Sequence, residues 1–176
     1  MEETFPTLAA IRANLAVIRQ GIVLLTSLRA EHYGQRLPLC FNASVGGHLR
    51  HIIEHYQAFL RGLDEEVIAY EQRVRDPLAE TDPVFAIGQL EAIAEQLESM
   101  ITALPNRALH YRTETLEGAV SGTTVLRELE FLVSHTIHHY ALVGVMARLQ
   151  GHEPEPEFGI APSTLKFRRQ QLLCAP

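Results

Sequence analysis

The sequence contains little cysteine and no excess of basic residues. Its two cysteines, Cys40 and Cys174, lie in unrelated contexts without Cys-x-x-Cys spacing, so we interpret both as reduced thiols without a catalytic role. The formal net charge of -6 excludes the basic surface that phosphate backbones require. Nucleic acid is therefore not an expected partner.

Signals of export and long apolar runs are also missing. Residues 1–10, MEETFPTLAA, carry acidic residues where a secretory signal carries basic ones. The apolar run GIVLL, residues 21–25, is much shorter than a bilayer-spanning helix. We therefore expect a cytoplasmic protein that does not enter membranes. The length of 176 residues fits a single domain, residues 1–176.

Helical periodicity dominates what the sequence does contain. Apolar residues recur at alternating steps of three and four in four long stretches, a pattern typical of amphipathic helices. The predicted helices run from Leu8 to Gly34, from Ser44 to before Pro77, from Asp82 to Pro105 and from Thr124 to Gln150.

Two further segments depart from this pattern. Residues 106–122 alternate β-branched and polar residues around Glu117-Gly118, which predicts an irregular crossover with a short hairpin. Residues 163–169, STLKFRR, predict a short helix in a proline-rich tail. We therefore predict an all-α fold, a four-helix bundle with one long crossover connection.

Six of the nine histidines lie in two short windows, HLRHIIEHY at residues 48–56 and HTIHH at residues 135–139. At about 100° per residue, His135 and His139 lie about 40° apart on one face of their helix. His138 lies about 60° to the far side of His135, so we predict that it is a surface residue. Glu128 falls about 20° from His135, two turns earlier.

The earlier window leaves more than one choice. His48, His51 and His55 all flank the apolar stripe of their helix, and helical geometry slightly favours His48 and His55 as the residues that face the second window. Two interpretations remain open from the residues alone. The histidines either hold a metal ion between two helices or form a metal-free polar seam of hydrogen bonds.

These motifs resemble the DinB/YfiT-like family of metalloenzymes. Ser44, His51 and Glu54 match the family's spacing Ser-x6-His-x2-Asp/Glu, and HTIHH matches its His-x-x-His-His motif. The resemblance implies a DinB-like four-helix bundle that holds a divalent metal, zinc or nickel, with His51, His135 and His139 as ligands.

With His51 as the ligand, we expect the additional His48 and His55 to line the pocket or to contact a ligand. The chain departs from the family at residues 140–142, where YAL stands in place of the common Arg-Gly-Gln. We therefore expect the substrate side of the site to differ.

Family members include thiol-dependent transferases and isomerases that use low-molecular-weight thiols. The resemblance thus implies a metal-dependent transferase or hydrolase acting on a small molecule, with such a thiol as a partner. Glu54 and Glu128 are candidate catalytic residues that orient a histidine or move a proton, although a structural hydrogen bond explains either one equally well. The alternative is a non-catalytic, stress-related bundle protein that binds a metal or another ligand. A homodimer is expected in either case.

Overall fold

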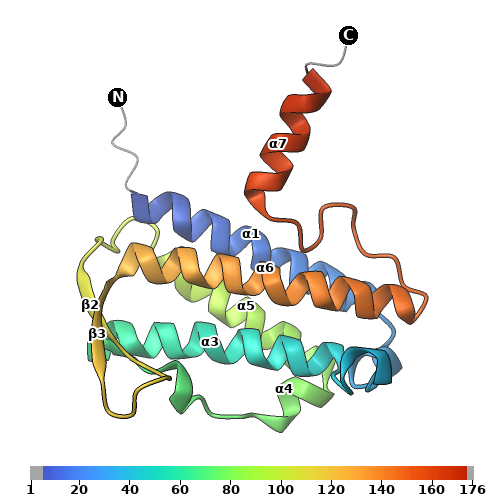
Figure 1. Ribbon diagram of the computed structural model, residues 1–176, viewed down its shortest axis with the longest axis horizontal. Coiled ribbons are helices and arrows are strands. Elements are labelled where there is room, and N and C mark those ends of the chain that lie inside the picture. The colour runs from blue at the N-terminus through green and yellow to red at the C-terminus, as the bar shows by residue number, and fades with distance from the viewer. Residues whose placement is uncertain (1–5, 174–176) are drawn as a thin grey trace.

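The computed structural model describes residues 6–173. The helices are α1 (Pro6–Ser27), α2 (Ala30–Tyr33), α3 (Val45–Glu65), α4 (Pro77–Thr81), α5 (Pro83–Ser99), α6 (Val125–Leu149) and α7 (Pro162–Leu173). The strands are β1 (Val67–Ile68), β2 (Ala108–Arg112) and β3 (Val120–Thr124), and 3₁₀ turns occupy Pro38–Cys40 and Tyr70–Gln72. The structure is therefore mostly helical, with the strands gathered at one end (Figure 1).

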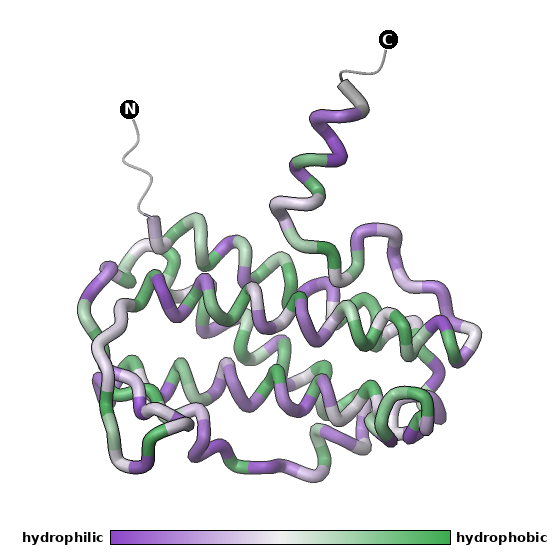
Figure 2. Tube along the Cα trace, in the orientation of Figure 1, coloured by the Kyte–Doolittle hydropathy of each residue, from purple (hydrophilic) through white to green (hydrophobic). Residues whose placement is uncertain are grey.

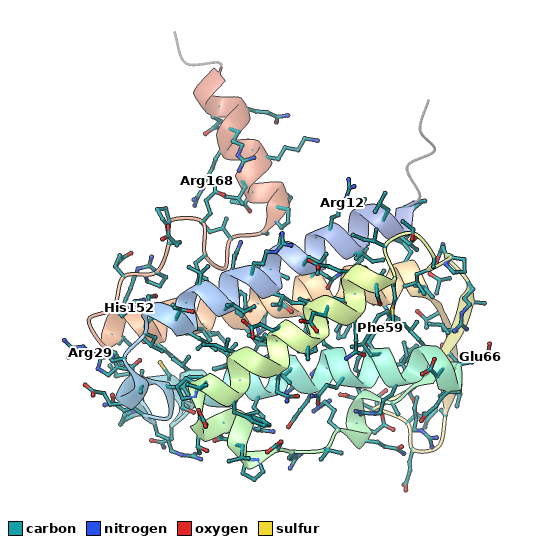
Figure 3. The ribbon with its side chains drawn as sticks, turned by 180° about the vertical axis from the view of Figure 1, so that it is seen from behind. Arg12, Arg29, Phe59, Glu66, His152 and Arg168 are labelled. Atoms are coloured by element: carbon teal, nitrogen blue, oxygen red, sulfur yellow. The ribbon has the colours of Figure 1, made fainter. Side chains whose placement is uncertain are left out.

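Four long helices enclose the hydrophobic core. Helix α1 packs on α5 and α6, and α3 packs on the same two helices, so their contacts form a closed cycle (Figure 1). Apolar and polar segments alternate along each of them (Figure 2), as expected for helices that bury one face. Phe59 of α3 is fully buried, whereas Arg12, Arg29 and Arg168 are exposed (Figure 3).

Side-chain caps begin three of these helices where the sequence predicts. The Ser44 hydroxyl accepts a hydrogen bond from the Gly47 backbone N–H, and Thr124 accepts one from Arg127 in the same way. Asp82 accepts from two backbone N–H groups of α5, and Pro83 occupies the first turn. These caps satisfy backbone donors that a helix start leaves unpaired. The predicted starts of α3, α5 and α6 are confirmed.

The predicted helix ends are less accurate. Helix α1 ends at Ser27, and the short α2 comes before Gly34. Helix α3 ends at Glu65 rather than near Pro77, because Glu66 takes a left-handed conformation with φ of 59°. Helix α5 ends at Ser99, several residues before Pro105.

The prediction of an all-α chain is wrong in one respect, since a three-stranded sheet is present. Strands β2 and β3 form the antiparallel hairpin expected within residues 106–122, with Leu109 opposite Thr123. Strand β1 adds to β2 in parallel, with Val67 opposite His110. The turn that ends α3 brings β1 so close that a Cβ on Gly62 would lie 2.6 Å from the Ile68 side chain. Glycine is therefore required at position 62 for this packing.

Helix α1 is long and apolar enough to cross a membrane by length and composition. Half of its most apolar window is buried inside the protein, where α1 packs on α5 and α6. Several apolar residues of α1, among them Ile11, Leu15 and Ile18, are therefore core residues.

After α6 the chain folds back before α7 begins. The Phe158 ring stacks on the Tyr140 ring at 4.7 Å between centroids, and Gly159 takes a positive φ of 67° beside the Tyr140 backbone. The predicted tail helix is present as α7, which projects away from the four long helices (Figures 1 and 3). Cys40 is a free thiol, as expected, and Cys174 lies outside the described residues.

A buried hydrogen-bond network links three of the long helices. The Tyr56 hydroxyl donates to Asn14 Oδ1 at 2.8 Å and lies 3.4 Å from the Thr136 hydroxyl, which donates to it. The Asn14 amide also donates to the Leu129 carbonyl at 3.0 Å. Because these groups are buried, their bonds fix the rotation of α1, α3 and α6 relative to one another.

We predict that Tyr56→Phe lowers the free energy of unfolding by about 1 to 2 kcal/mol, because Asn14 Oδ1 stays buried without its donor. Chemical denaturation measures this change. Tyr111→Phe is the matched control, since the Tyr111 hydroxyl has no hydrogen-bond partner among the described residues. Equal losses in both variants would contradict the assigned role of the network.

Candidate metal centre

Helices α3 and α6 bring the two histidine windows together. Helix α3 supplies His48, His51 and His55 at steps of three and four, and α6 supplies His135 and His139 one turn apart. The two helices are in direct contact, so histidines distant in sequence become neighbours in space. His138 is exposed, as predicted.

The ring nitrogens converge on one region. His135 Nε2 lies 3.2 Å from His51 Nε2 and 3.1 Å from His139 Nε2. Nitrogens of His51, His55 and His135 also all lie within 4.8 Å of one another. His55 is thus part of the cluster itself, and the His51–His135 pair is common to both sets of three.

The hydrogen bonds of two rings define which nitrogen is free. His55 Nδ1 lies 2.8 Å from the His51 carbonyl oxygen, which can only accept, so Nδ1 carries the proton and Nε2 keeps a lone pair. His48 Nδ1 and His139 Nδ1 are 2.8 Å apart, and one of them must donate to the other. When His139 is the donor, its Nε2 is bare and turned toward His135. This is the usual way in which a neighbour orients a metal-binding imidazole.

Partial burial keeps the cluster uncharged at neutral pH. Desolvation, followed by repulsion from neighbouring histidines and, for His51, His55 and His135, from Arg73, lowers the pKa of His51 to about 2, of His55 and His139 to about 3, and of His135 to about 4. Desolvation lowers the pKa of His48 as well. Neutral imidazole is the form that binds metals, so protons compete weakly for these nitrogens.

The nitrogen spacing fits a divalent ion better than a metal-free seam. Two imidazoles bound to one ion at about 2.1 Å have nitrogens about 3.0 to 3.4 Å apart, which matches the pairs at His135. Without an ion, His135 Nε2 faces two other Nε2 atoms and can donate to only one or accept from only one. His135 Nδ1 is buried without a partner among the described residues. The cluster can therefore hold a metal ion.

Glu54, which precedes His55 on α3, is buried and paired with guanidinium groups. Its carboxylate lies 2.8 Å from Arg50 Nη1 and 3.7 Å from Arg73 Nε. Arg73 Nη1 in turn lies 3.5 Å from His55 Nε2. Glu54 thus holds a cationic group beside the histidines and is itself engaged by arginine.

Glu128 is also buried, and both of its oxygens are occupied. Tyr70 O–H donates to one oxygen at 2.7 Å and Thr123 O–H donates to the other at 2.6 Å. Desolvation by burial, together with this carboxylate, raises the pKa of the Tyr70 hydroxyl far above its usual range, so Tyr70 stays protonated. Glu128 connects α6 to the hairpin and to the segment after β1.

A pocket of about 940 Å³ opens beside the cluster, between α6 and the β2–β3 hairpin. His55 and His135 are part of its lining. The Tyr70 ring stacks on His55 at 5.1 Å and the Phe131 ring stacks on His135 at 5.3 Å. The Arg127 guanidinium lies over the Phe131 ring at 5.7 Å. A small molecule in this pocket therefore meets two aromatic rings, a guanidinium and the edge of the histidine cluster.

Sequence reasoning missed Tyr70, Phe131 and Arg127. Positions 127, 131 and 135 are spaced at i, i+4 and i+8, so the helix face that carries His135 contained a signal for Phe131 and Arg127. Helical geometry predicts that Arg127 lies on the same exposed side of the helix as His138. Arg127 is indeed exposed, and its side chain lines the pocket. Tyr70 comes after a turn whose position depends on pairing between β1 and β2, which leaves no local signal.

Histidines from two facing helices, close enough to share an ion and next to a pocket, form an arrangement that can hold a metal ion in a helical protein. The DinB superfamily model matches residues 9–143, and the chain belongs to this superfamily. The matched range contains all five clustered histidines and ends before α7. No curated protein of known role matches the sequence.

The pKa values predict how metal-free protein responds to acid. The unfolded chain titrates near the ordinary histidine pKa of 6.5, and the folded cluster titrates at about 4 or below, so the unfolded state binds protons first as the pH falls. The histidine contribution to stability is therefore fully present above pH about 6.5 and is lost toward pH about 4.

Melting temperatures of chelator-treated protein between pH 7.5 and pH 4 test this expectation. A His51→Gln, His135→Gln double variant should lose less stability over the same interval, whereas His138→Gln should behave like the wild type. Parallel pH curves for wild type and the double variant would show that the cluster does not titrate as described.

Proposed function

We propose that the chain is a divalent-metal-dependent enzyme that acts on a small molecule, with a low-molecular-weight thiol as substrate or co-substrate. The observation that carries this proposal is the convergence of neutral histidine nitrogens beside an open pocket that His55 and His135 line. The proposed ligands are His51, His135 and His139, and zinc or nickel is the proposed metal. The four long helices are then the four-helix bundle of a cytoplasmic member of the superfamily.

When bound, a divalent ion supplies the acidity that deprotonates a coordinated thiol or water at neutral pH. The chain's own residues orient the reactants. His48 holds the tautomer of His139, and Phe131 and Tyr70 exclude water from one wall of the pocket. Arg127 has no ion-pair partner among the described residues and binds an anionic group of the substrate.

The buried carboxylates act on structure in this proposal. Glu54 positions Arg50 and Arg73, and Glu128 positions Tyr70 and the hairpin. Arginines are thus the ion-pair partners of Glu54, and hydroxyl groups are the hydrogen-bond donors to Glu128. His55 Nε2, which keeps its lone pair and lines the pocket, is the nearest group able to take a proton there.

The engaged carboxylates also favour a second candidate, a non-catalytic metal- or ligand-binding protein with a stress-related role. In either case we propose a homodimer, because α6 exposes Leu142, Val145 and Leu149 at helical spacing on its outer surface. Turnover with panels of thiols and electrophiles separates the enzyme from the binding protein.

Elemental analysis of protein purified without a histidine tag is the first test of the metal. We expect about one ion per chain in the wild type, strongly reduced occupancy in His139→Ala and unchanged occupancy in His138→Ala. The two residues are adjacent, but only His139 faces His135. Equal losses in both variants, or no ion in the wild type, would refute the proposed site.

Arg127→Gln tests the proposed substrate contact. For a thiol that carries a carboxylate we expect KM to rise about 10-fold or more with kcat little changed, because one charge-assisted hydrogen bond contributes about 1.5 to 3 kcal/mol to binding. For 2-mercaptoethanol, which is neutral, KM should stay the same. Arg19→Gln, an exposed arginine on α1, is the matched control. A similar rise for both thiols would exclude charge recognition by Arg127.

A further inference from the structure

His55 lies between the histidine cluster and the pocket, and its Nε2 has no strong partner. Its Nδ1 proton is committed to the His51 carbonyl at 2.8 Å, so Nε2 carries the lone pair. The nearest donor to Nε2 is Arg73 Nη1 at 3.5 Å, the outer limit of a hydrogen bond. Arg73 is already held by the Tyr70 carbonyl, Glu54 and Glu114. His55 is 4% exposed, so solvent does not satisfy the nitrogen well.

The two overlapping triads of the cluster describe a single site. His51, His135 and His139 form one triad by their short Nε2 contacts, and His51, His55 and His135 form the other. A bare ring nitrogen has one lone pair and binds one ion. Both triads contain His51 and His135, so one ion bound by this pair has His139 and His55 as its two neighbouring histidines.

We propose that His55 is a fourth protein ligand of this ion, on the side of the pocket; this inference rests on the metal site of the proposed function. The separations allow it. Nitrogens bound to one ion at about 2.1 Å are about 3.4 Å apart in tetrahedral geometry and about 4.2 Å apart on opposite sides of the ion, so a separation of up to 4.8 Å closes with a movement of roughly half to one and a half ångströms.

The other neighbouring histidine does not fit this role. His48 Nδ1 is engaged by His139 Nδ1 at 2.8 Å, and its ring centroid lies 5.1 Å from that of His139. By contrast, the His55 centroid lies 4.1 Å from that of His135 and 4.2 Å from that of His51. His48 therefore orients the ligand His139, whereas His55 lies next to His51 and His135.

A fourth imidazole changes the chemistry that the site can perform. Four protein ligands complete a tetrahedral zinc site and leave no position for substrate. An ion that accepts five or six ligands keeps a position open toward the pocket. The number of imidazoles bound to zinc thus decides whether the zinc-loaded protein has a closed, structural site or a site that can bind substrate.

X-ray absorption of the full-length protein loaded with Zn²⁺ or Co²⁺ counts the imidazoles directly. We expect four in the wild type and three in His55→Phe, which keeps the ring between Tyr70 and His135 but has no nitrogen. Competition with a chelator should show that His55→Phe weakens Zn²⁺ binding by about 100-fold or more, since loss of a supporting residue alone costs about 10- to 100-fold.

His138→Phe is the matched control and should retain four imidazoles and wild-type affinity. His55→Ala, checked for helix content and melting temperature without metal, gives a second variant with the same expected count. Three imidazoles in the wild type, or wild-type affinity and Co²⁺ spectrum in His55→Phe, overturn the proposal. Four imidazoles without turnover support it while refuting the proposed enzyme, and a wild type that binds no ion refutes both.

Discussion

The structure depends on one constraint: neutral imidazoles from α3 and α6 are held face to face, largely out of water. His135 Nε2 meets two other Nε2 atoms at 3.1 and 3.2 Å, and hydrogen bonds among the rings cannot satisfy all of these nitrogens. Desolvation favours the uncharged rings. Such an arrangement is costly as a polar seam and favourable as a cation site, because one ion uses every lone pair that the rings direct at it.

The core on the other side of the same helices maintains this arrangement. Tyr56 is the next residue after His55, Thr136 is the next after His135, and the two hydroxyls are 3.4 Å apart in the interior. Since adjacent residues on a helix point about 100° apart, bonding Tyr56 to Asn14 and Thr136 turns His55 and His135 outward toward the pocket. The polar network of the core and the histidine cluster are thus two consequences of one helix rotation.

Local signals were sufficient to predict the helix starts and insufficient to predict the helix ends. Ser44, Asp82 and Thr124 act within three residues of their own positions, so their effects can be predicted from sequence. The end of α3 depends on a left-handed Glu66 and on pairing of β1 with a strand about 40 residues away, and no local pattern encodes such a contact. Helical geometry placed His135, His138 and His139 well. It could not choose among three histidines that span about 60° of α3, because side-chain rotamers shift a nitrogen by more than that difference.

The single lone pair of His55 Nε2 can either bind the metal ion or accept a proton from a substrate. Glu54 is paired with arginines and is not among the residues that line the pocket, and each oxygen of the pocket-lining Glu128 already accepts a hydrogen bond from a hydroxyl group. If His55 binds the ion, its lone pair no longer accepts a proton, and acid–base chemistry in the pocket must come from groups bound to the metal. If it does not, His55 is the base closest to the substrate, and the ion keeps three protein ligands with an open position. Ligand and base are therefore mutually exclusive roles for this residue, and the site performs one of two distinct kinds of chemistry according to which role His55 takes.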